Sequence, residues 1–228
     1  MKVSVLIPCY NEEDNIIECI NRVELPYKYE IVVIDDGSKD KTKEKANSVK
    51  KNNLRVIGYK KNQGKGNAIR FGVENATGDI IVIQDADMTS PPEELSDVLN
   101  PILEDKADFV NGTRFYYPME KNAMNKMRFF GNRIFAIIIS LVLRVRLSDT
   151  LCGFKAFNIN KFKYLDLNET SWPDFELLFQ AKKSGMKIVE VPIHYKERKY
   201  GKTKMKEFKH GLIFTKMLIK NIIDFYLE

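Results

Sequence analysis

The stretch IIVIQDADMTSPP, residues 80–92, places two carboxylates directly after a run of apolar side chains. Residues 80–84 are typical of a buried strand, and residues two apart on a strand point to the same side. Asp85 and Asp87 would therefore crowd each other at the exposed end of the strand unless a cation lies between them. Taken alone, the pair is more typical of solvated turn acids, so its meaning depends on the rest of the chain.

Similar apolar runs alternate with helical patterns through the first half of the chain. Predicted strands span residues 3–7, 30–34, 54–59, 80–84 and 109–110, and predicted helices span 12–23, 39–51, 67–75 and 92–103. Asn11 is the expected cap of the first helix. Strands that are apolar throughout and alternate with helices indicate an α/β fold, in which helices cover both faces of a mostly parallel sheet.

The second half is less regular. A basic stretch at 121–133 leads into an apolar helix ending near Leu143, followed by a turn-rich segment at 148–157, a helix at 175–184, a strand at 189–195 and an amphipathic helix at 208–227. Because no linker interrupts the chain, we predict one domain over residues 1–207 with a C-terminal helical extension at 208–228. The apolar run 134–143 is about half the length that a membrane-spanning helix needs.

Charge and cysteine content limit the partners and the location. The net charge is +6, and residues 196–220 alone carry nine Lys or Arg against two Glu. Such a segment fits a membrane surface or an anionic substrate; it contains no nucleic-acid-binding motif, so we expect no nucleic-acid partner. Three cysteines without metal-ligand spacing and a start unlike a signal peptide predict a cytoplasmic protein.

Polar residues follow each predicted strand of the first half. They lie at 8–12, 35–38, 62–66, 85–87 and 112–114. Ligands of such sheets collect at the carboxyl edge. Lys65 between two glycines at a helix start suits a phosphate, Asp85 and Asp87 suit Mg²⁺ or Mn²⁺, and Asp36 could bind a base or ribose. Each feature alone is also typical of an ordinary turn, but together they predict a site for a nucleotide diphosphate.

Several motifs resemble those of the inverting glycosyltransferase family 2: residues 7–12, 33–38 with Asp40, 62–66 and 85–87. Residues 112–114, 149–155 and 198–204 are similar to its dolichyl-phosphate mannose synthase branch. The resemblance covers almost the whole chain in the family's order. It implies a GT-A fold, which is a Rossmann-like nucleotide-diphospho-sugar transferase fold, with a nucleotide-sugar half at about 1–115 and an acceptor half at about 116–207.

The resemblance also implies roles for individual residues. Those expected to hold the nucleoside are Pro8, Tyr10, Glu12 and Asp36, with Lys65 near the donor. Asp85 would hold sugar or nucleotide groups and, with Asp87 and Thr89, the metal; Thr89 stands where this branch commonly has Gln. Those expected to meet phosphate are Arg114, Arg128, Arg198 and Lys202.

The expected reaction is transfer of a hexose onto dolichyl or polyprenyl phosphate at the cytoplasmic face of a membrane, with or without a membrane-protein subunit. GDP-mannose is the first candidate donor and UDP-glucose the alternative, because of Thr89. If the acceptor were a sugar hydroxyl, Glu176 would be the expected base. A nucleotide-sugar-binding or membrane-scaffolding protein without turnover is a further alternative. The final helix either lies in a membrane interface or packs on the domain.

Overall fold

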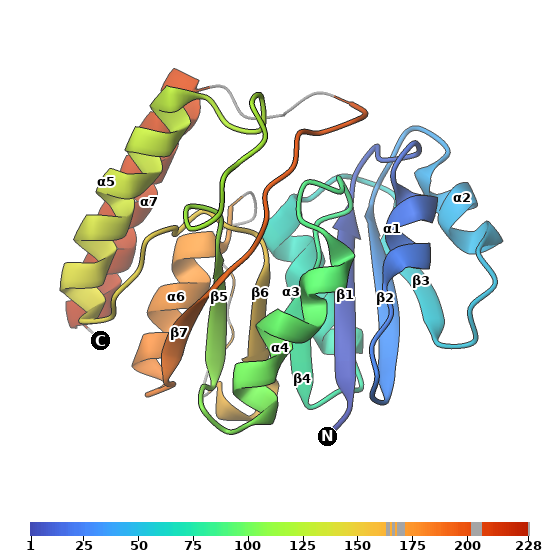
Figure 1. Cartoon of the computed structure of the whole chain (residues 1–228), viewed down its shortest axis with the longest axis horizontal. Coiled ribbons are helices and arrows are strands. Elements are labelled where there is room, and N and C mark those ends of the chain that lie inside the picture. The colour runs from blue at the N-terminus through green and yellow to red at the C-terminus, as the bar shows by residue number, and fades with distance from the viewer. Residues whose placement is uncertain (163–164, 166, 168–171, 202–206, 228) are drawn as a thin grey trace.

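The computed structural model describes residues 1–162, 165, 167, 172–201 and 207–227, and within these residues one sheet of seven strands organises the chain. The strands are β1 Val3–Cys9, β2 Tyr29–Asp36, β3 Leu54–Tyr59, β4 Ile80–Ile83, β5 Phe109–Thr113, β6 Lys155–Asn158 and β7 Ile188–Pro192. Their order is β3-β2-β1-β4-β6-β5-β7 (Figure 1). Strand β6 is antiparallel to β4 and β5, whereas the other neighbours pair in parallel.

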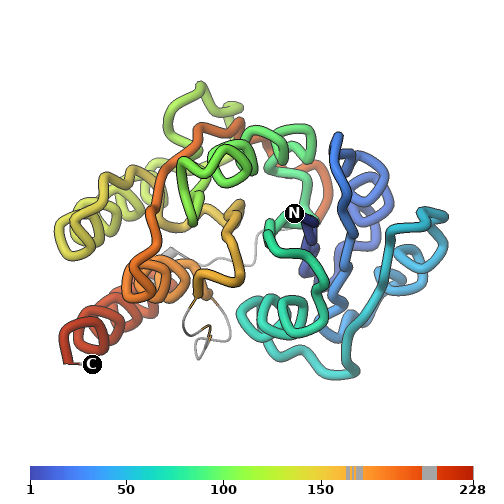
Figure 2. Tube along the Cα trace, turned by 90° about the horizontal axis from the view of Figure 1, so that it is seen from below, coloured from blue at the N-terminus to red at the C-terminus, as the bar shows by residue number. Residues whose placement is uncertain are grey.

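Helices cover both faces of this sheet. They are α1 Ile16–Arg22, α2 Thr42–Ser48, α3 Lys65–Asn75, α4 Leu95–Leu103, α5 Lys126–Leu143, α6 Asp174–Lys183 and α7 Glu207–Leu227, with short 3₁₀ turns η1 Pro92–Glu94 and η2 Ile159–Lys161. Alternate strand residues face opposite layers: Val5 belongs to the apolar core that includes residues of α1, α2 and α4, and Leu6 belongs to the core that includes residues of α3, α5, α6 and α7. Figure 2 shows α3 and α4 on opposite sides of the sheet. The predicted α/β architecture is confirmed.

The structure corrects three local predictions. The first helix begins at Ile16 with Asn15 as its cap, because Asn11 has a left-handed backbone (φ 54°) and its side chain instead accepts the Lys39 N–H at 2.8 Å. The basic stretch is partly helical, since α5 begins at Lys126. The segment predicted as turn-rich contains β6, which begins with the buried Lys155 and therefore carries little apolar signal.

Strand β6 matters because of its direction. Ile83 at the end of β4 and Asn111 in β5 both pair with Lys155, the first residue of β6. Since β6 runs antiparallel, the loop that precedes it lies at the edge where β4 and β5 end. Residues 148–154 are thereby brought to the same rim as Asp85.

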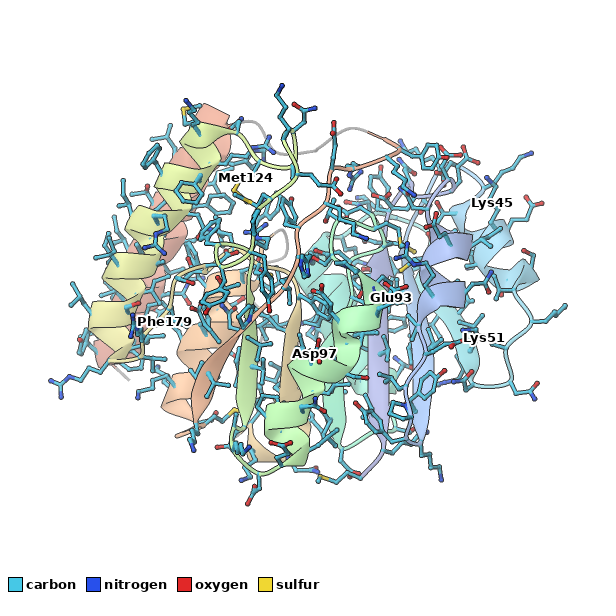
Figure 3. The ribbon with its side chains drawn as sticks, in the orientation of Figure 1. Lys45, Lys51, Glu93, Asp97, Met124 and Phe179 are labelled. Carbon is cyan, nitrogen blue, oxygen red and sulfur yellow. The ribbon has the colours of Figure 1, made fainter. Side chains whose placement is uncertain are left out.

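Helices α5 and α7 lie side by side at one end of the molecule (Figure 1), and the rings of Phe135 and Phe214 are 6.2 Å apart. Helix α7 also packs on α6, where Phe179, labelled in Figure 3, lies 5.7 Å from Phe225 between ring centres. The final helix therefore does pack on the domain, while Leu212 on its outer side stays exposed. Among the described helices, none combines the length and apolarity needed to cross a membrane.

Candidate active site

A cavity of about 590 Å³ opens at the carboxyl edge of the sheet. It brings together the predicted residues Pro8, Tyr10, Glu12, Asp36, Lys65, Asp85, Asp87, Thr89, Arg114, Arg128 and Arg198. Met124, which also lines it, lies near the top of Figure 3, beyond the strand ends. Glu176 is buried but does not line the cavity, and Lys202 lies outside the described residues.

Asp36 organises the loop between β3 and α3. Its carboxylate accepts the backbone N–H of Gln63 at 2.7 Å and of Gly64 at 3.0 Å, and the side-chain amide of Asn62 at 2.7 Å. Gly64 has φ 94°, a backbone conformation that side chains other than glycine rarely adopt. The sequence predicted Asp36 as a nucleoside ligand; the structure adds that this carboxylate holds the loop that starts α3.

Lys65, the first residue of α3, crosses the cavity floor to Asp85. Its Nζ lies 2.5 Å from Asp85 Oδ1. Burial favours the neutral amine, but the charges of Asp85 and Asp174 raise the pKa of Lys65 above its ordinary value. Gly153 allows this pair to lie against the loop before β6, because a Cβ there would approach both the Asp85 carboxylate and Lys65 Nζ to less than 3.0 Å.

Asp87 is held by the turn that follows β4 and by an arginine that is distant in the sequence. One carboxylate oxygen accepts the N–H and the hydroxyl of Thr89, at 3.1 and 2.8 Å. The other accepts Arg198 Nη2 at 2.7 Å, and Arg198 also reaches Glu12 at 3.2 Å. Burial alone would raise the pKa of Asp87, but the Arg198 charge holds it below its ordinary value. Met88, with φ 62°, is a strained residue inside this turn.

Arg114, at the end of β5, is paired with a residue that the sequence analysis did not single out. Its Nε and Nη2 donate to the two oxygens of buried Asp149, at 2.6 and 2.8 Å. Asn132 of α5 donates to the same carboxylate at 2.5 Å, so this network ties α5 to the sheet. Arg114 also lies under the Tyr195 ring, with its Cζ 4.9 Å from the ring centre. The one available signal for Asp149 was its place in the 149–155 motif.

Asp174, rather than Glu176, faces the cavity. The two residues are separated by about 200° around α6, so they cannot point the same way. Lys155 Nζ, fully buried, lies 3.4 Å from Asp174 Oδ1 and donates to Asn111 Oδ1 at 2.8 Å. The carboxylate that α6 contributes to the cavity is therefore Asp174, and it is positioned by a lysine of β6.

The carboxylate oxygens in this cavity suit a divalent cation that is bound partly by the protein and partly by a substrate. Asp85 and Asp87 offer hard oxygens, but among the described residues no three His, Cys, Asp or Glu side chains gather as a complete metal site. Mg²⁺ commonly binds one or two carboxylates and completes its shell with substrate phosphates and water. The arrangement can therefore hold a cation together with a diphosphate; a ligand role for Thr89 stays a prediction, since its hydroxyl donates to Asp87.

Two curated relatives have sequences similar to this chain. A dolichol-phosphate mannosyltransferase of Pyrococcus furiosus is 32% identical over 219 residues, covering 90% of this chain and 60% of that protein. A dolichyl-phosphate beta-glucosyltransferase of Dictyostelium discoideum is 29% identical over 218 residues, covering 86% of this chain and 66% of that protein. The chain thus spans less than two thirds of either relative.

Solved structures support the fold. Glucosyl-3-phosphoglycerate synthase from Mycobacterium tuberculosis, in complex with Mn²⁺, UDP and glucosyl-3-phosphoglycerate, matches 98% of this chain and 79% of its own, with a TM-score of 0.73 at 19% identity. Mannosyl-3-phosphoglycerate synthase from Rubrobacter xylanophilus matches 98% of this chain and 74% of its own, with a TM-score of 0.75 at 19% identity. The predicted GT-A fold is confirmed. The model of Glycosyl transferase family 2 matches residues 4–166, and the chain belongs to that family.

Proposed function

We propose that the chain transfers a hexose, with inversion, from a nucleoside diphosphate sugar to a polyprenyl phosphate at a membrane surface. GDP-mannose is the first candidate donor and UDP-glucose the second, and the cytoplasmic face is the location that the sequence favours. The names of the two curated relatives support a dolichyl-phosphate acceptor and leave the choice between mannose and glucose open. In this proposal residues 1–115 bind the donor and residues 116–207 the acceptor.

The observation that carries the proposal is that α5 both lines the cavity and exposes apolar side chains. Arg128 and Asn132 line the cavity. Other faces of the same helix expose Phe130, Ile134 and Leu141 by 62%, 58% and 74%. An acceptor that has a phosphate at one end and a hydrocarbon chain at the other matches a helix that brings Arg128 to the cavity and also exposes an apolar surface.

Neighbouring features support a membrane location for this apolar surface. Helix α7 exposes Leu212, Ile219 and Ile223 by 69%, 53% and 48% beside α5. Basic residues interspersed with such apolar side chains favour an anionic interface, at about 1 kcal/mol for each basic residue close to the surface. We infer that these two helices lie against the membrane that contains the acceptor.

The chemistry requires bond formation between an acceptor phosphate oxygen and the anomeric carbon while the bond to the nucleoside diphosphate breaks. Lys65 and the cavity arginines would neutralise the charge that develops on the leaving diphosphate. A divalent cation held at Asp87 and Asp85 would supply further neutralisation of that group. A phosphate monoester has a second pKa near 6, so the attacking oxygen needs no strong base. For a sugar hydroxyl acceptor, Asp174 takes the place that the sequence analysis gave to Glu176.

A transfer assay tests the proposal. The purified chain is incubated with vesicles containing polyprenyl phosphate, Mn²⁺ and labelled GDP-mannose or UDP-glucose, and label is counted in the organic extract. We expect lipid-extractable label from one donor, loss of it in Asp87→Asn, and no loss in Asp97→Asn, because Asp97 lies exposed on α4 away from the cavity (Figure 3). Chelation with EDTA should also abolish transfer.

Other outcomes separate the alternatives. Absence of lipid label with both donors contradicts the proposal. Diphosphate binding without transfer to any acceptor identifies a non-catalytic binding protein, and label on a water-soluble sugar identifies a hydroxyl acceptor.

A further inference from the structure

Arg198 forms an ion pair with Asp87, the carboxylate that the proposed function assigns to a divalent cation. Its Nη2 is 2.7 Å from Asp87 Oδ2, and the other oxygen of Asp87 accepts two hydrogen bonds from Thr89. The same nitrogen reaches Glu12 Oε1 at 3.2 Å. Both oxygens of Asp87 are thus engaged by donors of the chain itself.

Backbone hydrogen bonds hold the segment that carries Arg198 in this position. After β7 the chain crosses the carboxyl edge of the sheet toward β1 (Figure 1). There the N–H of Lys196 donates to the carbonyl of Thr89 at 2.8 Å, and the N–H of Glu197 donates to Glu120 Oε2 at 2.6 Å. The segment that carries Arg198 is therefore fixed to the very turn that carries Asp87, and the two side chains are only 21% and 20% exposed.

A guanidinium and a divalent cation cannot share Asp87 without cost. A cation about 2.1 Å from a carboxylate oxygen would lie only about 4 to 5 Å from a guanidinium nitrogen bound to the same group, where like charges repel strongly at low dielectric. Arg198 must leave Asp87 when a cation binds. A diphosphate beside the cation offers the guanidinium a new anionic partner, and arginine binds phosphate oxygens well.

We propose that Arg198 is an internal competitor that makes cation binding at Asp87 conditional on the nucleoside diphosphate. Without the diphosphate, Arg198 neutralises Asp87 and keeps affinity for the divalent cation low. With it, Arg198 turns to the phosphates and Asp87 becomes available, so cation and diphosphate bind cooperatively. This inference rests on the proposed function for the presence of both ligands, and it adds the residue that couples them.

The test measures Mn²⁺ binding directly, by the loss of the free-ion signal in electron paramagnetic resonance titrations. Wild type, Arg198→Gln and Arg198→Lys are titrated alone and with saturating GDP or UDP. Lys199→Gln is the matched control, because Lys199 is the next residue, is 64% exposed and lies 4.0 Å from Glu18, outside the cavity. Melting temperatures of all variants are measured in parallel, to establish that each is folded at the titration temperature.

Without nucleotide, Arg198→Gln should bind Mn²⁺ about tenfold more tightly than wild type, a typical size for a coupling between two sites. Arg198→Lys, which keeps the positive charge, and Lys199→Gln should bind it as weakly as wild type. With GDP or UDP the advantage of Arg198→Gln should disappear, since that variant loses its contact with phosphate.

Unchanged or weaker Mn²⁺ binding by folded Arg198→Gln without nucleotide would overturn the inference. The proposed function would survive that result if the diphosphate still promoted Mn²⁺ binding to wild type. By contrast, no Mn²⁺ binding by any variant with either nucleotide would overturn the metal site itself, and the inference with it.

Discussion

Gly153→Ala should weaken nucleotide binding without unfolding the protein. The new methyl group would lie less than 3.0 Å from the Asp85 carboxylate and from Lys65 Nζ, so this ion pair must move. Both groups are the ends of side chains, and the backbone of the loop can stay in place. The substitution therefore changes the cavity floor selectively.

The size of the effect follows from the contact that is lost. A hydrogen bond to a charged group contributes about 1.5 to 3 kcal/mol. If displaced Lys65 loses one such contact with the diphosphate, a loss of about 2 kcal/mol raises the dissociation constant roughly 30-fold. The melting temperature should stay within a few degrees of wild type.

Calorimetric titration of GDP and UDP in the presence of Mn²⁺ measures this change, with thermal unfolding recorded alongside. Gly131→Ala is the matched control, because a Cβ at Gly131 in α5 meets no heavy atom within 4 Å. The reasoning is refuted if Gly153→Ala binds both nucleotides as wild type does. It is equally refuted if binding is lost only because the variant unfolds.

Three further predictions concern stability and the membrane. Burial opposes ionisation of Glu30, but hydrogen bonds from Ser4, Thr77 and Arg55 lower the pKa of Glu30 to about 2. Its stabilising effect should be complete above pH 4.5 and lost toward pH 2. The difference in unfolding free energy between wild type and Glu30→Gln should therefore shrink by about 3 kcal/mol between pH 5 and pH 2 in urea titrations; no shrinkage would contradict this. Arg114→Ala leaves the buried Asp149 carboxylate without its arginine partner and should lower the free energy of unfolding in denaturant by about 3 to 5 kcal/mol. A decrease below about 1 kcal/mol would show that the ion pair is dispensable. The double variant Ile134→Glu, Leu141→Glu should release the protein from anionic vesicles in sedimentation assays at an unchanged melting temperature, and full retention would exclude α5 from the interface.

Much of the cavity rim formed by the first half of the chain could be predicted from the sequence, because its signals are local. Strands that are apolar on both faces indicate a parallel sheet, and parallel strands end at a common edge. Asp36, Lys65 and Asp85 follow three such strands, so their meeting at one rim required no knowledge of packing. The motif resemblance then specified the GT-A fold correctly.

The rest of the cavity depended on information that local patterns do not contain. Strand β6 has only four residues and starts with a buried lysine, so neither its existence nor its antiparallel insertion between β4 and β5 has a periodic signature. That insertion nevertheless places Gly153 against the Lys65–Asp85 pair. The choice between Asp174 and Glu176 likewise depended on the rotation of α6 about its own axis, which is fixed by how the helix packs on the sheet.

By itself the sequence determined the layer architecture and which residues of the first half lie at the carboxyl edge of the sheet, since periodicity and strand ends are encoded within a few residues. Only the tertiary structure showed which charges meet. Arg198 and Asp87 are separated by 111 positions, and Arg114 and Asp149 by 35. An ion pair requires two atoms within a few ångströms, so its partners are set by the register of distant segments on one scaffold, and composition or spacing along the chain carries no record of that distance.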